Sequence, residues 1–217
     1  MTSFRSSFIV AIFACVSGLS AGCATTSAGG SGSGSEAASY APLAVGNSWS
    51  YKVTPGPDDP QVVTVVSRDE QGYFVDDKGG RMAPRSDGVF DGQRFLLLEP
   101  LTMGATWTAV VPAGPQAAPG ARGVTEHYTI TATDAVVTVP AGTFDQCIEV
   151  QARQTMFDPN SGKPATLMMQ WTWSKGTGLI RVRQQARING ETTPITTATM
   201  ELLSFTPATP TTTATTP

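Results

Sequence analysis

The sequence has few of the side chains on which catalytic and metal sites depend. It contains one histidine and three cysteines among 217 residues, and only 14% of its residues are charged. A metal centre needs several histidine, cysteine or carboxylate ligands that converge, and the nucleophile motif Gly-x-Ser-x-Gly does not occur within residues 40–205. His127 and Glu126 are adjacent, so on a strand they point to opposite faces. We therefore expect no metal, no cofactor and no catalytic residues, and predict that the protein is not an enzyme.

Positive charge is also scarce. The 14 Lys and Arg residues are outnumbered by 17 Asp and Glu residues, which gives a formal net charge of −3. Binding to nucleic acid needs a large basic patch, so we expect no nucleic-acid partner. Cys147 is the one cysteine outside the N-terminal region, which excludes a disulfide within the domain. It stands among apolar residues in "FDQCIEV", and this setting predicts a buried structural thiol.

No apolar run is long enough to cross a bilayer as a helix, which takes ~20 residues. The shorter run from Phe8 to Val16 follows Arg5 and precedes small residues that end at Cys23. This is the layout of a secretory signal peptide, which we assign to residues 1–22. The stretch "GLSAGC" resembles the lipobox of bacterial lipoproteins, although Ser20 stands where that motif usually has an aliphatic residue. The resemblance implies that Cys23 is lipidated, for example with palmitate, and becomes the first residue of the mature protein.

The surrounding sequence predicts where the protein is located. Ala24 follows the cysteine where some inner-membrane lipoproteins of enteric bacteria carry Asp, which favours an anchor in the outer membrane, facing the periplasm. The alternatives are an inner-membrane anchor, or ordinary secretion after cleavage near Ala21 or Ala24. Residues 23–39 are mostly Gly, Ser and Ala after the cysteine, and predict a flexible tether with a reach of ~20 Å. Residues 40–205 form one domain, and the Thr/Pro-rich residues 206–217 are expected to be a disordered tail.

The domain alternates apolar and polar residues instead of spacing them as in helices. In "TLMMQWTW", for example, Leu167, Met169, Trp171 and Trp173 share one face. Turn-forming Asp, Asn and Gly residues separate such segments. The pattern predicts an all-β domain, either an antiparallel sandwich or a strongly curved, partly closed sheet. The expected strands are 48–54, 61–68, 71–76, 93–98, 105–111, 124–133, 135–139, 144–156, 166–173, 179–188 and 196–205.

One motif, Pro-Leu-x-x-Gly-x-x-Trp, occurs twice. It reads "PLAVGNSW" at 42–49 and "PLTMGATW" at 100–107. In each copy the glycine suits a turn with positive φ, and the chain then enters a strand whose Trp49 or Trp107 is expected to point inward. We interpret the copies as the starts of two similar repeats, near residues 40 and 98. The alternative is that both tryptophans line a ligand groove.

Three segments together resemble a broad group of exported bacterial β-rich proteins, many of them lipoproteins. They are "YAPLAVGNSWSYKV" (40–53), "VTVPAGTFDQCIEV" (137–150) and "WSKGTGLIRVR" (173–183). The shared motifs are Pro-Leu-x-x-Gly-Asn-x-Trp-x-Tyr and Val-Pro-Ala-Gly-Thr-Phe. The resemblance implies an all-β exported domain and transfers no catalytic residue.

Two sets of residues are candidates for a binding role. Arg181, Arg183 and Arg187 have the period-two spacing that puts them on one face of a strand. They could dock an acidic partner or a lipid headgroup, or they could pair across strands with acids such as Glu149 or Glu201. Trp49, Trp107, Met169, Trp171 and Trp173 could face a ligand or simply fill the core.

These observations lead to two hypotheses for function. The first is a non-catalytic, membrane-anchored module of the cell envelope that is structural or binds an envelope protein. The second is a periplasmic carrier that holds a lipid or another apolar ligand in a cavity of the curved sheet, with Met adapting to the ligand's shape.

Overall fold

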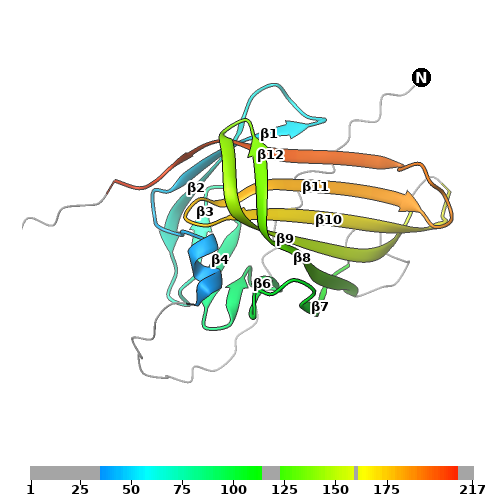
Figure 1. Ribbon diagram of the computed structural model, residues 1–217, viewed down its shortest axis with the longest axis horizontal. Coiled ribbons are helices and arrows are strands. Elements are labelled where there is room, and N and C mark those ends of the chain that lie inside the picture. The colour runs from blue at the N-terminus through cyan, green and yellow to red at the C-terminus, as the bar shows by residue number, and fades with distance from the viewer. Residues whose placement is uncertain (1–34, 114–122, 159–160, 210–217) are drawn as a thin grey trace, which may run out of the picture.

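The computed structural model describes residues 35–113, 123–158 and 161–209 of the chain. Within these ranges the regular elements are one short 3-10 helix and twelve strands (Figure 1). The elements are η2 (Glu36–Tyr40), β1 (Ser48–Thr54), β2 (Gln61–Arg68), β3 (Phe74–Asp76), β4 (Arg81–Arg85), β5 (Gly88–Phe90), β6 (Phe95–Leu98), β7 (Thr106–Pro112), β8 (Gly123–Val139), β9 (Gly142–Phe157), β10 (Pro164–Ser174), β11 (Gly178–Ile188) and β12 (Thr196–Thr206).

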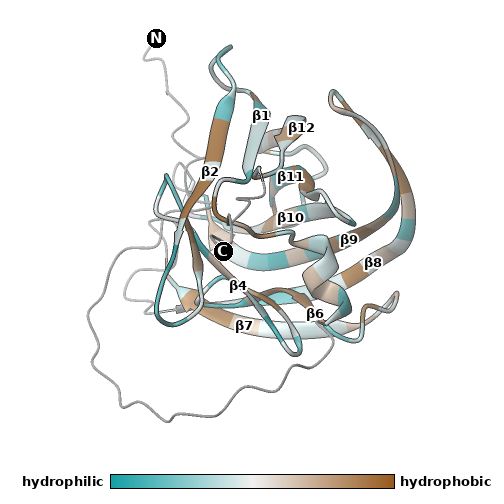
Figure 2. Cartoon of the chain, turned by 90° about the vertical axis from the view of Figure 1, so that its left-hand side faces the viewer, coloured by the Kyte–Doolittle hydropathy of each residue, from teal (hydrophilic) through white to brown (hydrophobic). Residues whose placement is uncertain are grey.

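All of these strands belong to one antiparallel sheet, in the order β6-β5-β4-β3-β2-β1-β12-β11-β10-β9-β8-β7. The first and last strands of the domain, β1 and β12, pair in the middle of this order, whereas the consecutive strands β6 and β7 form its two edges. The sheet curves so strongly that it is nearly closed (Figures 1 and 2). At the edges, Trp107 on β7 donates its indole N–H to the backbone oxygen of Phe95 on β6, at 3.0 Å. The prediction of a strongly curved, partly closed antiparallel sheet is confirmed.

The concave side of the sheet holds the core. Because side chains alternate along a strand, each long strand sends one set inward, and Trp171 and Trp173 are only 3% and 2% exposed. The rings of Trp107, Tyr128 and Trp171 stack in series, with centroid distances of 5.1 and 5.9 Å. A smaller apolar cluster consists of Met156, Ala165, Leu167, Ala186 and Ile188.

Both copies of the repeated motif form the same turn. Residues 44–47 and 102–105 are each closed by a hydrogen bond of 3.0 Å from the fourth amide to the first carbonyl oxygen. The third residue of each turn, Gly46 or Gly104, has a φ of 96° or 86°. Because the second residue of each turn, Val45 or Met103, does not have a positive φ, the turns are of type II, which strongly favours glycine at the third position.

The turn continues directly into a β-bulge. Gly46 donates its N–H to the oxygen of Val65, and Gly104 does the same to Ile130, at 2.8 Å in both cases. Val65 and Ile130 each donate back, at 2.9 Å, to the residue that follows the glycine. A glycine with positive φ as the first bulge residue is the G1 type of bulge. The motif thus fixes where a strand starts and which neighbouring strand it pairs with.

The tryptophan that ends each copy stacks on an aromatic ring of a neighbouring strand. Trp49 lies 5.1 Å from Phe205, its register partner on β12, and Trp107 lies 5.1 Å from Tyr128, its register partner on β8. The repeated sequence therefore codes for a repeated turn, bulge and aromatic contact.

Replacing Gly104 with alanine is expected to lower the free energy of unfolding by about 1–2 kcal/mol, because alanine disfavours positive φ. No atom lies within 4 Å of the added Cβ, so the backbone alone causes the loss. Gly104→Asn, which tolerates the left-handed conformation better, should lose less. Urea unfolding of the three proteins measures this, and an alanine variant as stable as the wild type would rule out the proposed role of Gly104.

The β8–β9 hairpin extends beyond its neighbours and folds over β10–β12 (Figure 1). Register shifts between Ile130 and Val137 bend it, and Gln146 on the returning strand has a φ of 49°. At its tip, in the segment "VPAGTF", Ala141 donates its N–H to the oxygen of Leu202 on β12, at 2.9 Å. Figure 2 shows the resulting arc of β8 and β9 and the alternation of hydropathy along them. The turn motif thus places the tip of the hairpin against the last strand.

Apart from shifts of one or two residues at strand ends, the strands differ from the prediction in three places. β4 and β5 were not expected, because Pro84 and Asp87-Gly88 are typical of turns. The expected strand 71–76 shrinks to β3, because the Asp69 carboxylate accepts the amides of Gln71 and Tyr73 and holds a loop there. The two strands expected at 124–133 and 135–139 are one continuous strand, β8, which absorbs the register shifts without ending.

The chain is ordered on both sides of the predicted domain. Residues 36–39, assigned to the tether from the sequence, belong to η2, and Ala37 within it is fully buried. Ser35 caps η2 by accepting the amide of Ala38. After β12, Ala208 donates its N–H to Oδ1 of Asn47, at 2.6 Å. The remainder of the predicted tail, 210–217, lies outside the described residues, as do residues 1–34.

Candidate functional site

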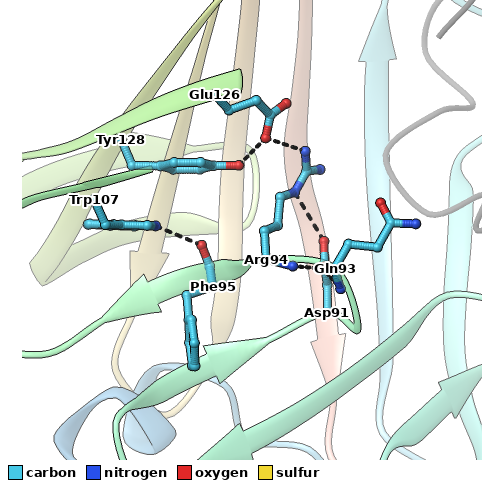
Figure 3. A network of polar contacts seen from close by, with 7 residues as sticks. All are labelled: Asp91, Gln93, Arg94, Phe95, Trp107, Glu126 and Tyr128. Atoms are coloured by element: carbon cyan, nitrogen blue, oxygen red, sulfur yellow. Dashed lines mark hydrogen bonds and ion pairs between the residues drawn. The ribbon is translucent and has the colours of Figure 1, made fainter. Parts of the chain in front are cut away.

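A buried polar network joins the start of the edge strand β6 to β8, the neighbour of the other edge strand β7 (Figure 3). Arg94, which immediately precedes β6, lies 2.6 Å from Oε2 of Glu126 through Nη1 and 3.1 Å from Oδ2 of Asp91 through Nε. Tyr128 donates its hydroxyl to the same Glu126 oxygen. Glu126 is 2% exposed and Tyr128 is 0% exposed. We call Asp91, Arg94, Glu126 and Tyr128 the edge network.

Local structure positions each member of the edge network. The Asp91 carboxylate accepts the amides of Gln93 and Arg94, at 2.9 Å each, and this turn directs Arg94 toward β8. Glu126 and Tyr128 are two residues apart on β8, so both side chains point to the concave side. The edge network therefore adds an ion pair beside the hydrogen bond between Trp107 on β7 and Phe95 on β6.

The pKa shifts in the edge network indicate a buried ion pair with a structural role. Burial raises the pKa of the Tyr128 hydroxyl, which therefore stays protonated and donates. Desolvation alone would lower the pKa of Arg94, but Glu126, Tyr128 and Asp91 together outweigh it and raise that pKa. A buried charge without a partner is unfavourable, so Arg94 and Glu126 stabilise each other.

A second polar cluster lies on the outer face of the sheet and involves one of the candidate arginines. Glu149 on β9 accepts hydrogen bonds from Arg181 at 3.1 Å, from Gln170 at 3.0 Å and from Thr172 at 3.3 Å. Arg181 is 8% exposed. Its charge is therefore paired across strands with Glu149 and is little exposed to a partner.

The other two candidate arginines have different surroundings. Arg183 is exposed, and Arg187 is half-buried with Nη2 donating to Gln185 at 3.4 Å. Neither forms an ion pair within the described part of the chain. Arg183 and Arg187 thus differ from Arg181, whose charge is paired with Glu149.

The candidate aromatic residues lie mainly in the core. Trp49 and Trp173 line an apolar pocket of about 50 Å³, together with Tyr51, Val65 and Phe74. That volume has room for a few water molecules, whereas ligand sites measure ~300–1,000 Å³. Trp171 is buried, and Trp107 and Met169 pack partly buried against the core. This pocket is too small to favour the carrier hypothesis.

The remaining polar candidates do not converge. Cys147 is fully buried, and burial raises the pKa of its thiol. His127 is exposed on the outer face of β8. Among the described residues, no group of three or more His, Cys, Asp or Glu side chains could hold a metal ion. In the same ranges, no helix has the length and apolarity to cross a membrane. Cys23 lies outside the described residues.

The edge network was not predicted from the sequence. The available signal was the position of Glu126, which shares its strand face with Tyr128 and Ile130 and therefore puts a carboxylate on the buried side. Such a carboxylate needs a buried partner. Nothing in the local sequence identifies Arg94 as that partner, because the contact depends on the curvature that brings the two edges together.

No family model matches the chain, and no curated protein matches it. Two solved structures match it at 14% sequence identity with a TM-score of 0.38, and each alignment covers 75% of this chain and 96% of the other. One is described as a candidate lipoprotein from Parabacteroides distasonis, and the other as a candidate exported protein with a YmcC-like fold from Bacteroides fragilis. A TM-score of 0.38 is too low to establish that either shares this fold.

Proposed function

We propose that the protein is a non-catalytic, lipid-anchored module of the bacterial cell envelope. Cys23 attaches it to the outer membrane on the periplasmic side, and its β-domain provides a surface for interaction. The observation that carries this proposal is the order of features along the chain. A segment typical of a signal peptide ends at Cys23, small residues follow, and a single folded domain begins close behind them.

The structure of the domain supports an interaction role. Its most buried acid–base pair, in the edge network, joins two strands of the sheet, and the Glu149–Arg181 pair does the same on the outer face. These ionisable groups contact one another, and none of the four lines the described pocket. What the domain presents to its surroundings is the broad outer face of its long strands.

Replacing Cys23 with serine is expected to abolish incorporation of labelled palmitate into the protein, because serine lacks the thiol that is acylated. Cys15→Ser and Cys147→Ser are matched controls, and both should keep the label. Labelling in growing bacteria, followed by separation of inner membrane, outer membrane and medium, measures both the modification and its location. Label that persists in Cys23→Ser, or unlabelled wild-type protein in the medium, would contradict the anchor.

A further inference from the structure

The outer face of β9, β10 and β11 carries an unusual set of side chains. Three consecutive rows of register partners point outward, and they contain three arginines and no carboxylate. The rows are Thr155–Thr166–Arg187, Arg153–Met168–Gln185 and Gln151–Gln170–Arg183. We call these three rows the cationic face.

The charges of the cationic face are not neutralised within the described part of the chain. Arg153 donates Nε to the amide oxygen of Gln151 at 2.9 Å, and Arg187 donates to Gln185, so neutral amides orient both guanidinium groups. Neither these two arginines nor Arg183 forms an ion pair there. The next row, Glu149–Thr172–Arg181, shows the contrast, because it contains its own carboxylate.

The spacing of the arginines indicates the kind of partner. Arg183 and Arg187 are four residues apart on one strand, or roughly 13 Å, and Arg153 lies two strands away, or roughly 10 Å. One small anion cannot contact three cations spread so widely, and the face is a sheet surface with side chains standing out from it. A partner with many separated negative charges fits this arrangement.

We propose that the cationic face docks on anionic phospholipid headgroups and holds the tethered domain against the membrane that anchors it. This inference rests on the proposed anchor at Cys23. The Gly/Ser-rich sequence between Cys23 and η2 predicts a tether with a reach of ~20 Å, so it keeps the face at a high effective concentration near the headgroups. The whole chain has a net charge of −3, but the rows of the cationic face contain three arginines and no carboxylate, with His127 beside Arg153 in register, so an anionic surface attracts this face.

The size of the effect follows from the number of cations. Each Arg close to an anionic membrane surface contributes on the order of fivefold to binding. Three of them shift the equilibrium between the membrane-contacting and free orientations on the order of a hundredfold. Because the attraction is electrostatic, high salt should weaken it strongly.

The test uses the full acylated chain in vesicles of phosphatidylcholine, alone or mixed with phosphatidylglycerol. A fluorophore sensitive to its environment is attached at Thr197→Cys, which lies beside Gln185 in register, or at Ser67→Cys on β2 as a reporter for another face. The intact mass first shows whether Cys23 is acylated, so that absence of the anchor is distinguished from absence of binding by the cationic face.

Two triple variants are compared. The cationic-face variant is Arg153→Gln/Arg183→Gln/Arg187→Gln. The control variant is Arg68→Gln/Lys78→Gln/Arg85→Gln, which removes the same charge from β2, β4 and the turn between β3 and β4.

We expect the reporter at residue 197 to contact the membrane only when phosphatidylglycerol is present. The equilibrium constant for contact should fall on the order of a hundredfold in the cationic-face variant, and should change little in the control variant. If the cationic-face variant does not fold, loss of contact by the wild type at high salt supports the proposal in its place. Equal contact in pure phosphatidylcholine, or contact unaffected by both the triple variant and salt, would overturn it. A reporter that responds to soluble polyglutamate but not to phosphatidylglycerol would assign the face to an acidic protein instead.

Discussion

Replacing Glu126 with alanine is expected to lower the free energy of unfolding by about 3–5 kcal/mol. The change leaves Arg94 buried without its closest countercharge and removes the acceptor for the Tyr128 hydroxyl, and unpaired buried charges carry costs of this size. Equilibrium unfolding in urea measures the loss. Glu70→Ala, at an exposed loop position, is the matched control and should stay within about 0.5 kcal/mol of the wild type.

A double-mutant cycle separates the Arg94–Glu126 contact from general damage to the core. Arg94→Ala and Glu126→Ala should be strongly non-additive, with the double variant more stable than the sum of the two losses predicts by about 1–3 kcal/mol. Additive losses would show that the two residues do not stabilise each other. The edge network would then not link β6 to β8 as described.

Replacing Trp49 with alanine is expected to cost about 3–5 kcal/mol, as is typical for a buried aromatic residue. Trp49 is 7% exposed, stacks on Phe205 and donates Nε1 to the oxygen of Thr177 at 2.7 Å. It thereby ties β1 to β12 and to the turn between β10 and β11. Trp49→Phe keeps the stacking but loses the hydrogen bond, so it should cost about 1–2 kcal/mol.

The equivalent residue of the second motif provides the comparison for Trp49. Trp107 has the same stacking distance, but it is only partly buried, so Trp107→Ala should cost less than Trp49→Ala. Thermal or urea unfolding of the two alanine variants decides the order. A larger loss at Trp107 would mean that the edge contact, and not the central β1–β12 pairing, limits the stability of the domain.

The strands and the turn motifs were predictable because their signals are local. Alternation identified the inward set that includes Trp171 and Trp173, and the glycine of each repeated motif pointed to a turn with positive φ, which Gly46 and Gly104 both have. Short strands were harder to predict, since Pro84 lies inside β4 and Gly88, which follows Asp87, is the first residue of β5. In these segments the turn-forming residues predicted turns, although the chain forms short strands there.

The features that involve distant residues could not be predicted in the same way. The pairing of β1 with β12 and the ion pair of Arg94 with Glu126 depend on how the whole sheet curves. The three candidate arginines show the limit most clearly. Period-two spacing correctly puts Arg181, Arg183 and Arg187 on one face. Register with β9 decides that Arg181 pairs with Glu149 and that Arg153 joins the other two.

The proposed lipid anchor at Cys23 is tested most directly by the mass of the N-terminal peptide of protein purified from bacterial membranes. We predict that this peptide begins at Cys23 and carries acyl chains on that residue. A peptide that begins at another residue, or one that contains an unmodified Cys23, would contradict it.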